Sequence, residues 1–372
     1  MASEINVLPA TAEDYEEVMS ISGGIYKGTD YLPYRYHAWL KDPRRRMYLA
    51  KCDDKVVGFE SFLLVDGGVT AVVEGLRVAP WMRGQGVAGI IQNFCINAIR
   101  ADHPEVKTVS MTRTENPPPS LLKKYSIINC KAIIFMHLPS DQVEEGLKLL
   151  ESRVDNSERS INHSVLGPTE VLKLFERTKL EEELLPGRRL VQCWLPLTTH
   201  KANLELLLER RIVWLYCHPC DTGDFLAESS DSTTCDTIRC QTSHEHSAIT
   251  ASTPTSSDST STTQSHHNSA PPPSSINTSS PRFLSLGTPP FPIPLAKGTH
   301  KLDIDLFGND PECAKIHVLK QLKMGIQALP AGGDIICVLY AEESLRAALN
   351  DLCEGLATFF YVREQMVLDM EI

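Results

Sequence analysis

The fold of this chain is decided by the stretch Val78-Ala79-Pro80-Trp81-Met82-Arg83-Gly84-Gln85-Gly86-Val87-Ala88. A strand is predicted to end at Val78, and a helix to begin within the stretch, because apolar residues recur at helical spacing from Val87 to Ile99. Gly84 and Gly86 let the backbone turn tightly and approach a ligand without a Cβ in the way. The first N–H groups of a helix lack intrahelical partners, and the helix dipole favours an anion. The stretch therefore predicts a pyrophosphate-binding site.

The neighbouring sequence places this site in an α/β domain with a mixed sheet. Alternating apolar residues, turn residues and helical spacing predict the order β-α-β-β-β-α-β-α-β over residues 1–140. The expected elements are strand 5–8, helix 11–21, strands 46–51, 55–65 and 69–78, a helix within 83–101, strand 106–112, helix 120–127 and strand 131–138. Residues 28–39 are predicted to form an aromatic-rich loop. A Walker loop is excluded because no Gly-Lys-Ser/Thr follows, and the glycine spacing excludes a dinucleotide fingerprint.

The spacing Arg83-x-x-Gly86-x-Ala88, directly after the strand, resembles the Q/R-x-x-G-x-G/A signature of the GNAT superfamily of acyl-CoA-dependent N-acetyltransferases. The order of elements is similar to that fold as well. Members often carry an Asn after the next strand and then a Tyr in an L-Y-x-K-x-G-F run. Asn116 and Tyr125 occupy these two places here.

Two residues of that second run depart from the family pattern. Asn129 stands where Gly is usual, and Asn is the next-best residue for a left-handed helix end. Cys130 stands where Phe is usual. The departures leave the fold prediction intact and weaken the placement of the helix that carries Tyr125.

The resemblance implies acetyl-CoA as co-substrate and no metal. The strand before the loop would bind the pantetheine, with a backbone N–H of Val78 facing the thioester carbonyl, and the loop would hold the pyrophosphate. The residues implied are Leu76, Arg77 and Val78 on the strand, Met82, Arg83, Gly84, Gln85, Gly86, Val87 and Ala88 in the loop, and Asn116 beyond it.

Acetyl transfer to an amine needs a proton acceptor for the amine, a donor for the oxyanion and an acid for the leaving thiolate. By resemblance Glu74 is the base, and its spacing of four residues from Val78 predicts that both side chains share one sheet face. Tyr125 is the acid. The alternatives are an ordinary strand carboxylate, paired with Arg77 or Arg113, and a tyrosine that only packs.

The acceptor is expected beneath the loop that follows the first helix. Its phenols, single carboxylate and guanidinium suit a small zwitterion, with Asp30, Tyr31, Tyr34 and Arg35 as candidate contacts. Arg35 would hold a carboxylate bidentately, and the aromatic faces would stack an imidazole. The alternative is that the tyrosines pack the loop.

Three further runs resemble the vertebrate histidine N-acetyltransferases and the probable N-acetyltransferases grouped with them: residues 30–33, 74–80 and 302–308. This resemblance implies transfer from acetyl-CoA to the α-amine of a free amino acid, L-histidine, giving N-acetyl-L-histidine and CoA. Two other functions stay open. One is acetylation of protein N-termini or polyamines, where a peptide would need an open groove across the sheet. The other is CoA binding with weak catalysis.

The second half divides into a low-complexity insert and a second domain. Residues 224–296 are predicted to be disordered, because their Ser, Thr and Pro cannot bury enough apolar surface to offset chain entropy. Residues 141–223 and 297–372 are predicted to form an α/β domain, degenerate and GNAT-like, with a structural or substrate-shaping role. Asp303 and Asp305 share a strand face there. That face is expected to be solvated, or else to lie within reach of an acceptor amine.

Composition limits the partners. The 372 residues carry a formal net charge of -11, and nucleic acid is not expected as a partner because phosphate contacts need a basic excess. No long apolar run or secretory leader is visible, so no membrane span is expected. Eleven cysteines without framework spacing indicate reduced thiols in a cytoplasmic protein, and Cys217-His218-Pro219-Cys220 is predicted to be structural. The oligomeric state stays open.

Overall fold

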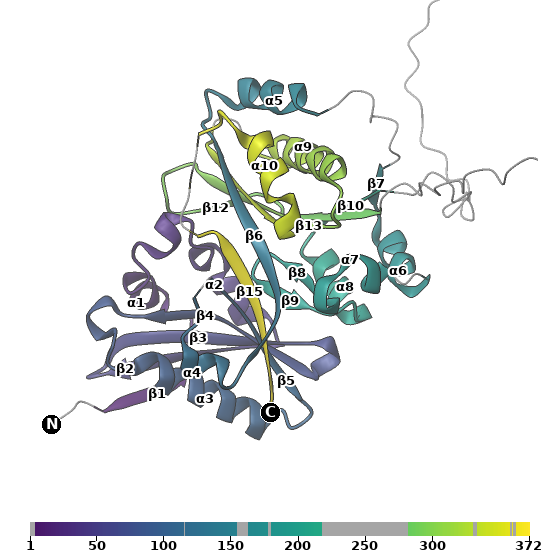
Figure 1. Ribbon diagram of the computed structural model, residues 1–372. Coiled ribbons are helices and arrows are strands. Elements are labelled where there is room, and N and C mark those ends of the chain that lie inside the picture. The colour runs from purple at the N-terminus through teal and green to yellow at the C-terminus, as the bar shows by residue number, and fades with distance from the viewer. Residues whose placement is uncertain are drawn as a thin grey trace, which may run out of the picture. The chain divides into compact units, whose positions relative to one another are not determined.

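A 13-stranded mixed sheet runs through the part of the chain that the computed structural model describes, residues 4–114, 116–154, 163–177, 180–217, 282–329, 333–357, 359 and 362–372. The order is β1-β2-β3-β4-β5-β15-β6-β14-β13-β11-β10-β7, with β12 beside β13 (Figure 1). The strands are β1 Ile5–Pro9, β2 Arg45–Cys52, β3 Lys55–Val65, β4 Thr70–Val78, β5 Thr108–Thr114, β6 Ser126–Leu138, β7 His163–Leu166, β10 Val213–Cys217, β11 Phe283–Gly287, β12 Phe291–Pro292, β13 His300–Phe307, β14 Ile335–Ala341 and β15 Glu364–Glu371. A separate hairpin pairs β8 Leu190–Gln192 with β9 Leu195–Leu197.

The helices confirm the predicted order of the first half with one addition. They are α1 Tyr15–Ser20, α2 Leu32–Lys41, α3 Val87–Asp102, α4 Pro119–Leu122, α5 Val143–Ser152, α6 Pro168–Arg177, α7 Leu180–Leu184, α8 Lys201–Glu209, α9 Pro311–Gln327 and α10 Arg346–Cys353. The predicted loop at 28–39 is wrong, because α2 begins inside it. Leu32, Tyr36 and Trp39 are all buried, and their spacing of four and three residues forms one helical face.

Helices α2 and α3 cover opposite faces of the first half of the sheet. The ring of Tyr36 on α2 lies 6.0 Å from that of Phe59 on β3. The neighbouring Gly58 lies against Val87 of α3, which a Cβ on the glycine would approach to 3.1 Å. Adjacent strand residues point to opposite faces, so the two helices lie on opposite sides. None of the helices within the described residues is long and apolar enough to cross a membrane.

The parallel strands β4 and β5 separate half-way along β4. They pair only through residues 70–73 of β4, whereas β4 continues to Val78 beside β3. The pairing with β3 shifts by one residue between Phe59 and Ser61, opposite Gly75, whose φ of +83° favours glycine. This bulge and the end of the β4–β5 pairing leave a gap at the C-terminal ends of two parallel strands, where ligands bind in many α/β folds.

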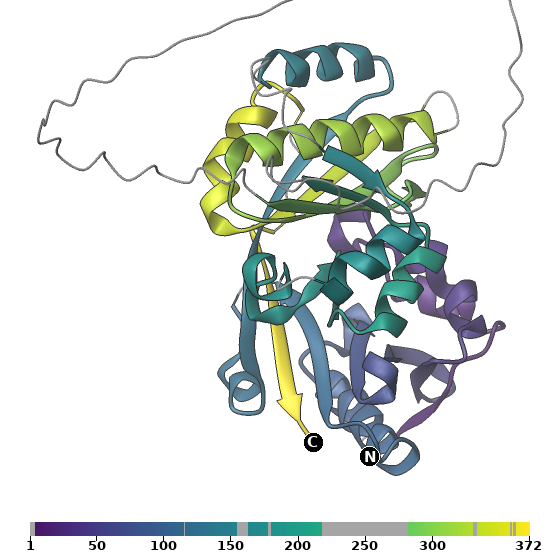
Figure 2. The ribbon, with the colours of Figure 1, turned by 90° about the vertical axis from the view of Figure 1, so that its right-hand side faces the viewer.

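The second half repeats the parallel strand–helix–strand unit of the first. Strands β13 and β14 are parallel with α9 between them in the chain, as β4 and β5 are with α3. Figure 2 shows α9 lying over the strands of the second half. The two halves share one sheet: β15, from the end of the chain, lies between β5 and β6, and β6 also pairs with β14. The predicted boundary at residue 140 therefore does not separate two sheets.

The predicted insert at residues 224–296 extends too far at its C-terminal end. Phe283–Gly287 forms β11, with all five residues buried between β10 and β13, and Phe291–Pro292 forms β12. The short apolar run Phe283-Leu284 was hidden by its Ser- and Pro-rich surroundings. The remainder of the predicted insert up to residue 281, and residues 218–220 of the Cys-x-x-Cys motif, lie outside the described residues.

Candidate active site

The loop between β4 and α3 has the geometry of an anion site. Gly84 and Gly86 have φ of +79° and +84°, and Gly86 is the N-cap of α3. No side chain of the described residues caps this helix, so its first N–H groups are available to a ligand. A Cβ built on either glycine would meet nothing within 4 Å, so the space beside the loop is open. Arg83 Nε donates to Val78 O at 3.3 Å, which ties the loop to the end of β4.

The end of β4 presents backbone to the gap. Ala79 N–H donates to Val57 O at 2.9 Å. Because successive N–H groups of an antiparallel strand point alternately toward and away from the partner, the N–H of Val78 points away from β3. Arg77 can contribute only its backbone, since its side chain is buried against Asp30. Asn116 is exposed beyond β5 and lines none of the cavities described below.

A cavity of about 540 Å³ lies between α3, α4 and the sheet. Its walls include Gln92, Asn97, Arg100, Lys124 and Tyr125, together with Glu60 of β3. Tyr125 follows α4, which ends at Leu122, and burial together with the nearby Glu60 raises the pKa of Tyr125 to about 12. The expected helix end at Asn129 is wrong, because Asn129 is a buried residue within β6.

A second cavity, of about 130 Å³, fills the gap between β4 and β5. Four residues line both cavities, so the two join there: Glu60, Val73, Gln92 and Met111. The walls of the second cavity also include Glu74 and, on the α2 side, Tyr26, Tyr31 and Trp194. Tyr31 therefore lies where the acceptor was expected.

Glu74 lines the gap as an ion-paired carboxylate. Its Oε1 accepts from Arg45, which has no exposed side-chain surface and also donates to Ser61 Oγ at 2.9 Å. The partner is thus neither Arg77 nor Arg113. Glu74 pairs across the sheet with Ser61, and Val78 with Gly58, three residues away on β3. The expected common face is therefore wrong, since the bulge at Gly75 puts the two side chains on opposite faces.

Glu60 is a candidate site residue that the sequence prediction missed. Its side chain is 2% exposed and no Lys or Arg of the described residues pairs with it. Burial raises the pKa of Glu60 to about 8, although hydrogen bonds with Cys95 and Gln92 of α3 lower it, and Oε2 has no partner. An acidic residue within the apolar strand 55–65 was the signal that could have revealed it.

Asp30 does not lie where an acceptor contact was predicted. It is 3% exposed, its Oδ1 accepts from Arg77 Nη2 at 2.6 Å and from Leu32 N–H at 3.0 Å, and it lines none of the described cavities. The Arg77 guanidinium lies 5.6 Å from the Tyr31 ring centre and 5.8 Å from that of Tyr26. Asp30 therefore supports the tyrosines of the gap instead of contacting an acceptor.

Tyr34 and Arg35 line a third pocket, of about 230 Å³, beside α2. The second half supplies its other wall, which includes Gln192, Arg210 and Phe291. No local pattern could have predicted these three, because they lie more than 150 residues from α2 in the chain. The two predicted residues are therefore brought together with partners from the other half.

Residues 193–194, in the turn between β8 and β9, lie over the gap on its α2 side. Thr112 Oγ1 donates to Trp194 O, and Gln365 Nε2 donates to Cys193 O, each at 2.6 Å. The Trp194 ring is nearly parallel to that of Tyr26, 6.2 Å away. This turn obstructs a groove across the sheet at the gap.

The expected solvated face at Asp303 and Asp305 is wrong, because both side chains are fully buried. Lys301 Nζ lies 3.1 Å from Asp303 Oδ1, and Lys131 Nζ lies 4.0 Å from Asp305 Oδ1. Burial raises the pKa of Asp305 to about 7. Neither aspartate lines the described cavities, so their observed role is to pair buried lysines.

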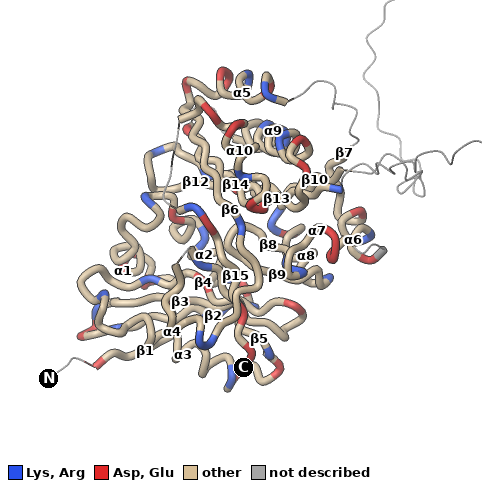
Figure 3. The backbone as a smooth tube through the Cα atoms, viewed as in Figure 1, with Lys and Arg blue, Asp and Glu red and all other residues tan. Residues whose placement is uncertain are grey.

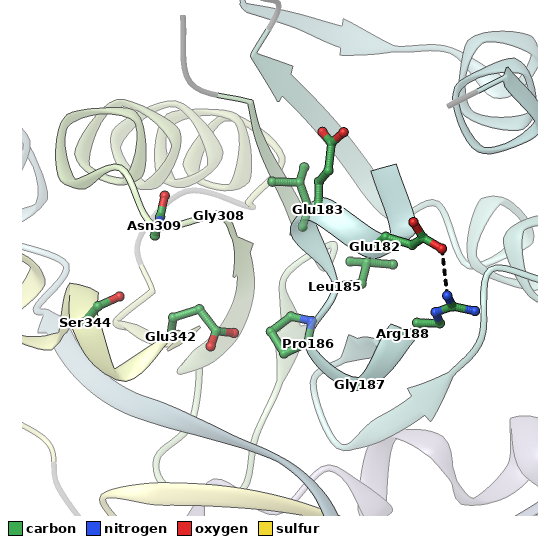
Figure 4. A pocket seen from close by; sticks show the side chains of 11 residues that line it. Glu182, Glu183, Leu185, Pro186, Gly187, Arg188, Gly308, Asn309, Glu342 and Ser344 are labelled. Atoms are coloured by element: carbon green, nitrogen blue, oxygen red, sulfur yellow. Dashed lines mark hydrogen bonds and ion pairs between the residues drawn. The ribbon is translucent and has the colours of Figure 1, made fainter. Parts of the chain in front are cut away.

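The loop between β13 and α9 in the second half corresponds to the β4–α3 loop, and it lies beside an acidic cavity (Figure 4). A cavity of about 760 Å³ there is lined by Glu182, Glu183 and Glu342, and Figure 3 shows the acidic run of α7. Asp310 already caps α9, since its Oδ1 accepts from Cys313 N–H at 2.7 Å. Glu182 and Glu183 are ion-paired with Arg188 and Arg282. The Asp310 carboxylate occupies the N-terminus of α9, so the second half lacks the uncapped helix start that the β4–α3 loop provides.

Possible metal ligands are scattered. Within the described ranges, no three His, Cys, Asp or Glu residues are grouped so as to hold a metal ion. Cys217, the one described residue of the Cys-x-x-Cys motif, lies with its Sγ 3.6 Å from that of Cys313.

Known proteins resemble the whole chain. Residues 10–118 match the family described as acetyltransferase (GNAT), and residues 159–227 and 274–342 match the family described as histidine N-acetyltransferase, C-terminal. The probable N-acetyltransferase 16 of Homo sapiens is 31% identical over 380 residues, covering 100% of this chain and 87% of that protein. The histidine N-acetyltransferase of Xenopus tropicalis is 30% identical over 373 residues, covering 99% and 96%.

Two solved structures share the fold across both halves. A tandem GNAT protein from the clavulanic acid biosynthesis pathway has a TM-score of 0.50 at 11% identity, covering 99% of this chain and 98% of its own. A GCN5-related N-acetyltransferase from Sphaerobacter thermophilus has a TM-score of 0.51 at 12% identity, covering 99% and 95%. At these identities the likeness concerns the fold alone.

Proposed function

The chain belongs to the histidine N-acetyltransferase family, and on this premise we propose that it transfers the acetyl group of acetyl-CoA to the α-amine of free L-histidine. The products are N-acetyl-L-histidine and CoA. One observation carries the proposal: the gap between β4 and β5 joins a cavity lined by Tyr125 to a cavity lined by Glu74. A thioester entering from the α3 face would meet an amine entering from the α2 face there.

Acetyl-CoA would be held mainly by backbone. The loop of residues 82–88 would bind the pyrophosphate at the start of α3, mainly through the N–H groups of residues 83–84 and 86–88, because those of Met82 and Gln85 already donate to Ala79 O and Met82 O. The pantetheine would follow residues 76–78 of β4, with the N–H of Val78 donating to the thioester oxygen as negative charge develops on it. Two features support this placement: the open space beside Gly84 and Gly86, and the end of β4, which is unpaired on its β5 side.

Glu74 would take a proton from the ammonium group of the acceptor. Arg45 fixes the orientation of the Glu74 carboxylate through Oε1. Oε2 has no partner among the described residues and is the oxygen available to the ammonium. The role of Glu74 as base therefore depends on an ion pair that positions it without occupying both oxygens.

Tyr125 and Glu60 would protonate the leaving thiolate together. A phenol of pKa about 12 donating to a thiolate of pKa about 8.5 would be uphill by about 5 kcal/mol. Glu60 has a pKa of about 8 and is mostly protonated at neutral pH, so it can return a proton to the Tyr125 oxygen as the phenol donates. The overall transfer from Glu60 to the thiolate is then close to balanced, and Glu60 recovers its proton from solvent.

The cover over the gap supports a small acceptor. Trp194 lies where a peptide would have to cross the sheet, and hydrogen bonds from Thr112 and Gln365 hold its turn in place. A free amino acid needs only the α2 side of the gap. This observation favours a free amino acid over a protein N-terminus.

The test is release of CoA from acetyl-CoA by the purified full chain with each of the twenty amino acids, a histidine-initiated peptide and spermidine. We expect turnover with L-histidine above the other acceptors. Activity with the peptide alone would overturn the proposal. CoA binding without turnover of any acceptor would instead favour a binding protein.

A further inference from the structure

The pocket beside α2 contains two guanidinium groups for which the described part of the chain offers no carboxylate partner. Arg35 contacts the Phe291 ring, whose centre lies 5.3 Å from the Arg35 Cζ. Neither Arg35 nor Arg210 has an ion pair or a side-chain hydrogen bond within the described residues. Asp42, the acidic residue in the pocket wall, is already paired with Arg44. The pocket therefore has an excess of positive charge.

The charge on one of these guanidinium groups disfavours the charge on the other. Burial, and then repulsion from Arg35 and Arg45, lowers the pKa of Arg210 to about 10, even though two nearby carboxylates raise it. Arg210 still carries its charge at neutral pH, so the free protein holds two like charges in a partly buried pocket. An anion bound between Arg35 and Arg210 would offset that repulsion.

A neutral donor lines the same pocket. Gln192 is 2% exposed, and its Nε2 has no hydrogen-bond acceptor among the described residues. A buried amide N–H without a partner is costly, and native structures rarely leave one unsatisfied. The pocket therefore offers two charged donors and one neutral donor, which suit a ligand with a carboxylate and a further, neutral oxygen.

This pocket is separate from the cavity proposed for the acceptor. The two cavities share no lining residue. Trp39 and Arg45 lie between them, with the Arg45 Cζ 3.8 Å from the centre of the Trp39 ring and the Arg45 guanidinium paired with Glu74. An amino acid whose amine is at Glu74 therefore cannot place its carboxylate between Arg35 and Arg210, and a ligand of this pocket is a second molecule.

Charge selects the class of that ligand. A free amino acid would bring its ammonium group beside two guanidinium groups, which repel it. N-acylation replaces the ammonium group by a neutral amide, whose carbonyl oxygen accepts hydrogen bonds, and leaves the carboxylate unchanged. An N-acylated amino acid thus has the oxygens that the three donors need and no group that they repel.

We propose that Arg35, Arg210 and Gln192 form a second site that binds an N-acylated amino acid, with its carboxylate at the guanidinium groups and its amide oxygen at Gln192. The choice of N-acetyl-L-histidine as the ligand rests on the proposed function, because it is the product of that reaction. Arg35 comes from α2, whereas Gln192 ends β8 and Arg210 follows α8. The stacked rings of Tyr34 and Phe291, with centres 5.6 Å apart, offer a face to the imidazole.

The test is calorimetric titration of N-acetyl-L-histidine into the purified full chain, with CoA and L-histidine present in excess to fill the acceptor cavity. We expect a single remaining site per chain. Arg210→Gln and Arg35→Gln should each weaken this binding about 10- to 100-fold, because each removes a charged donor to the carboxylate. N-acetyl-L-histidinamide lacks the carboxylate and acetate lacks the amide, so each should bind at least about 10-fold more weakly.

Arg211→Gln is the matched control, because Arg211 is the exposed neighbour of Arg210. Urea unfolding of the free Arg210→Gln variant should show no loss of stability, since the change removes a cation without a carboxylate partner. Equal binding by wild type and Arg210→Gln would overturn the site. A raised KM for L-histidine in Arg210→Gln would also overturn it, because Arg210 would then belong to the acceptor cavity. Acetate binding as tight as that of N-acetyl-L-histidine would overturn the class of ligand.

The titration needs no turnover, so the second site and the proposed function fail separately. If the chain acetylates L-histidine but does not bind N-acetyl-L-histidine through Arg210, the second site fails and the proposed function stands. Binding that depends on Arg210, in a chain that acetylates no amino acid, would support the site and overturn the proposed function.

Discussion

Replacing Glu60 by Gln should raise the free energy of unfolding and lower the rate of turnover. The Glu60 carboxyl has a pKa of about 8 in the folded chain and about 4.5 when unfolded. Between these values the folded state binds more protons, so its stability falls as pH rises. At pH 7 the difference of 2.5 units, at about 1.4 kcal/mol per unit, amounts to about 3 kcal/mol, and it reaches about 5 kcal/mol above pH 8. Gln is nearly isosteric and has no charge to bury, so it avoids this cost.

Urea unfolding at pH 4, 7 and 8.5 measures the effect. The stability difference between Glu60→Gln and wild type should be small at pH 4, reach about 3 kcal/mol at pH 7 in favour of the variant, and grow further at pH 8.5. Turnover should fall about 10²-fold, because the Tyr125 oxygen loses its proton supply. Glu145→Gln, an exposed change on α5, should show neither effect. A stability difference that does not vary with pH would refute the assignment of Glu60 as a buried neutral carboxyl. Unchanged turnover would refute its catalytic role.

Four further substitutions test other parts of the site. Glu74→Gln and Tyr125→Phe should each lower kcat about 10²-fold, and unchanged turnover in either would remove that assignment. Gly86→Val should raise KM for acetyl-CoA, because a branched residue strains the φ of +84° and its side chain enters the space beside the loop; unaltered CoA affinity by calorimetry would contradict an anion site there. Asp30→Ala should cost about 3–5 kcal/mol in urea unfolding, since it leaves Arg77 buried without its partner, and a loss below 1 kcal/mol would mean that water reaches the guanidinium.

The sequence predicted those helices and loops that are determined by residues close together in the chain. The Gly84–Gly86 loop and α3 follow from residues within a few positions of one another, and the structure has both where they were expected. Helix α2 was missed for a local reason too: its aromatic residues include the exposed Tyr34 as well as the buried Tyr36 and Trp39, so its buried face did not stand out. Strand β11 was missed because five residues are too short a run to recognise beside a low-complexity stretch.

The arrangement of the site could not be predicted from any single strand, because it depends on how the strands pair. Glu74 and Val78 appear to share a face until the pairing with β3 reveals the extra residue at Gly75. Arg210 gives no local sign of the pocket that it lines, since a basic residue after an amphipathic helix is ordinary. The other wall of that pocket is α2, which is distant from Arg210 in the chain.

The gap itself depends on hydrogen bonding elsewhere in the sheet. Over its second half β4 is paired only on its β3 side, while β5 is paired along residues 108–114 with β15. Strand β15 pairs with β5 along its whole length, so β5 is not an exposed sheet edge even where it is not paired with β4. The two parallel strands can therefore separate. Strand β15 comes from the last residues of the chain, and Gln365 of the same strand also holds the turn over the gap. In the proposed reaction the second half would therefore act twice, by keeping the gap open for the thioester through β15 and by holding the turn that covers the gap on its α2 side.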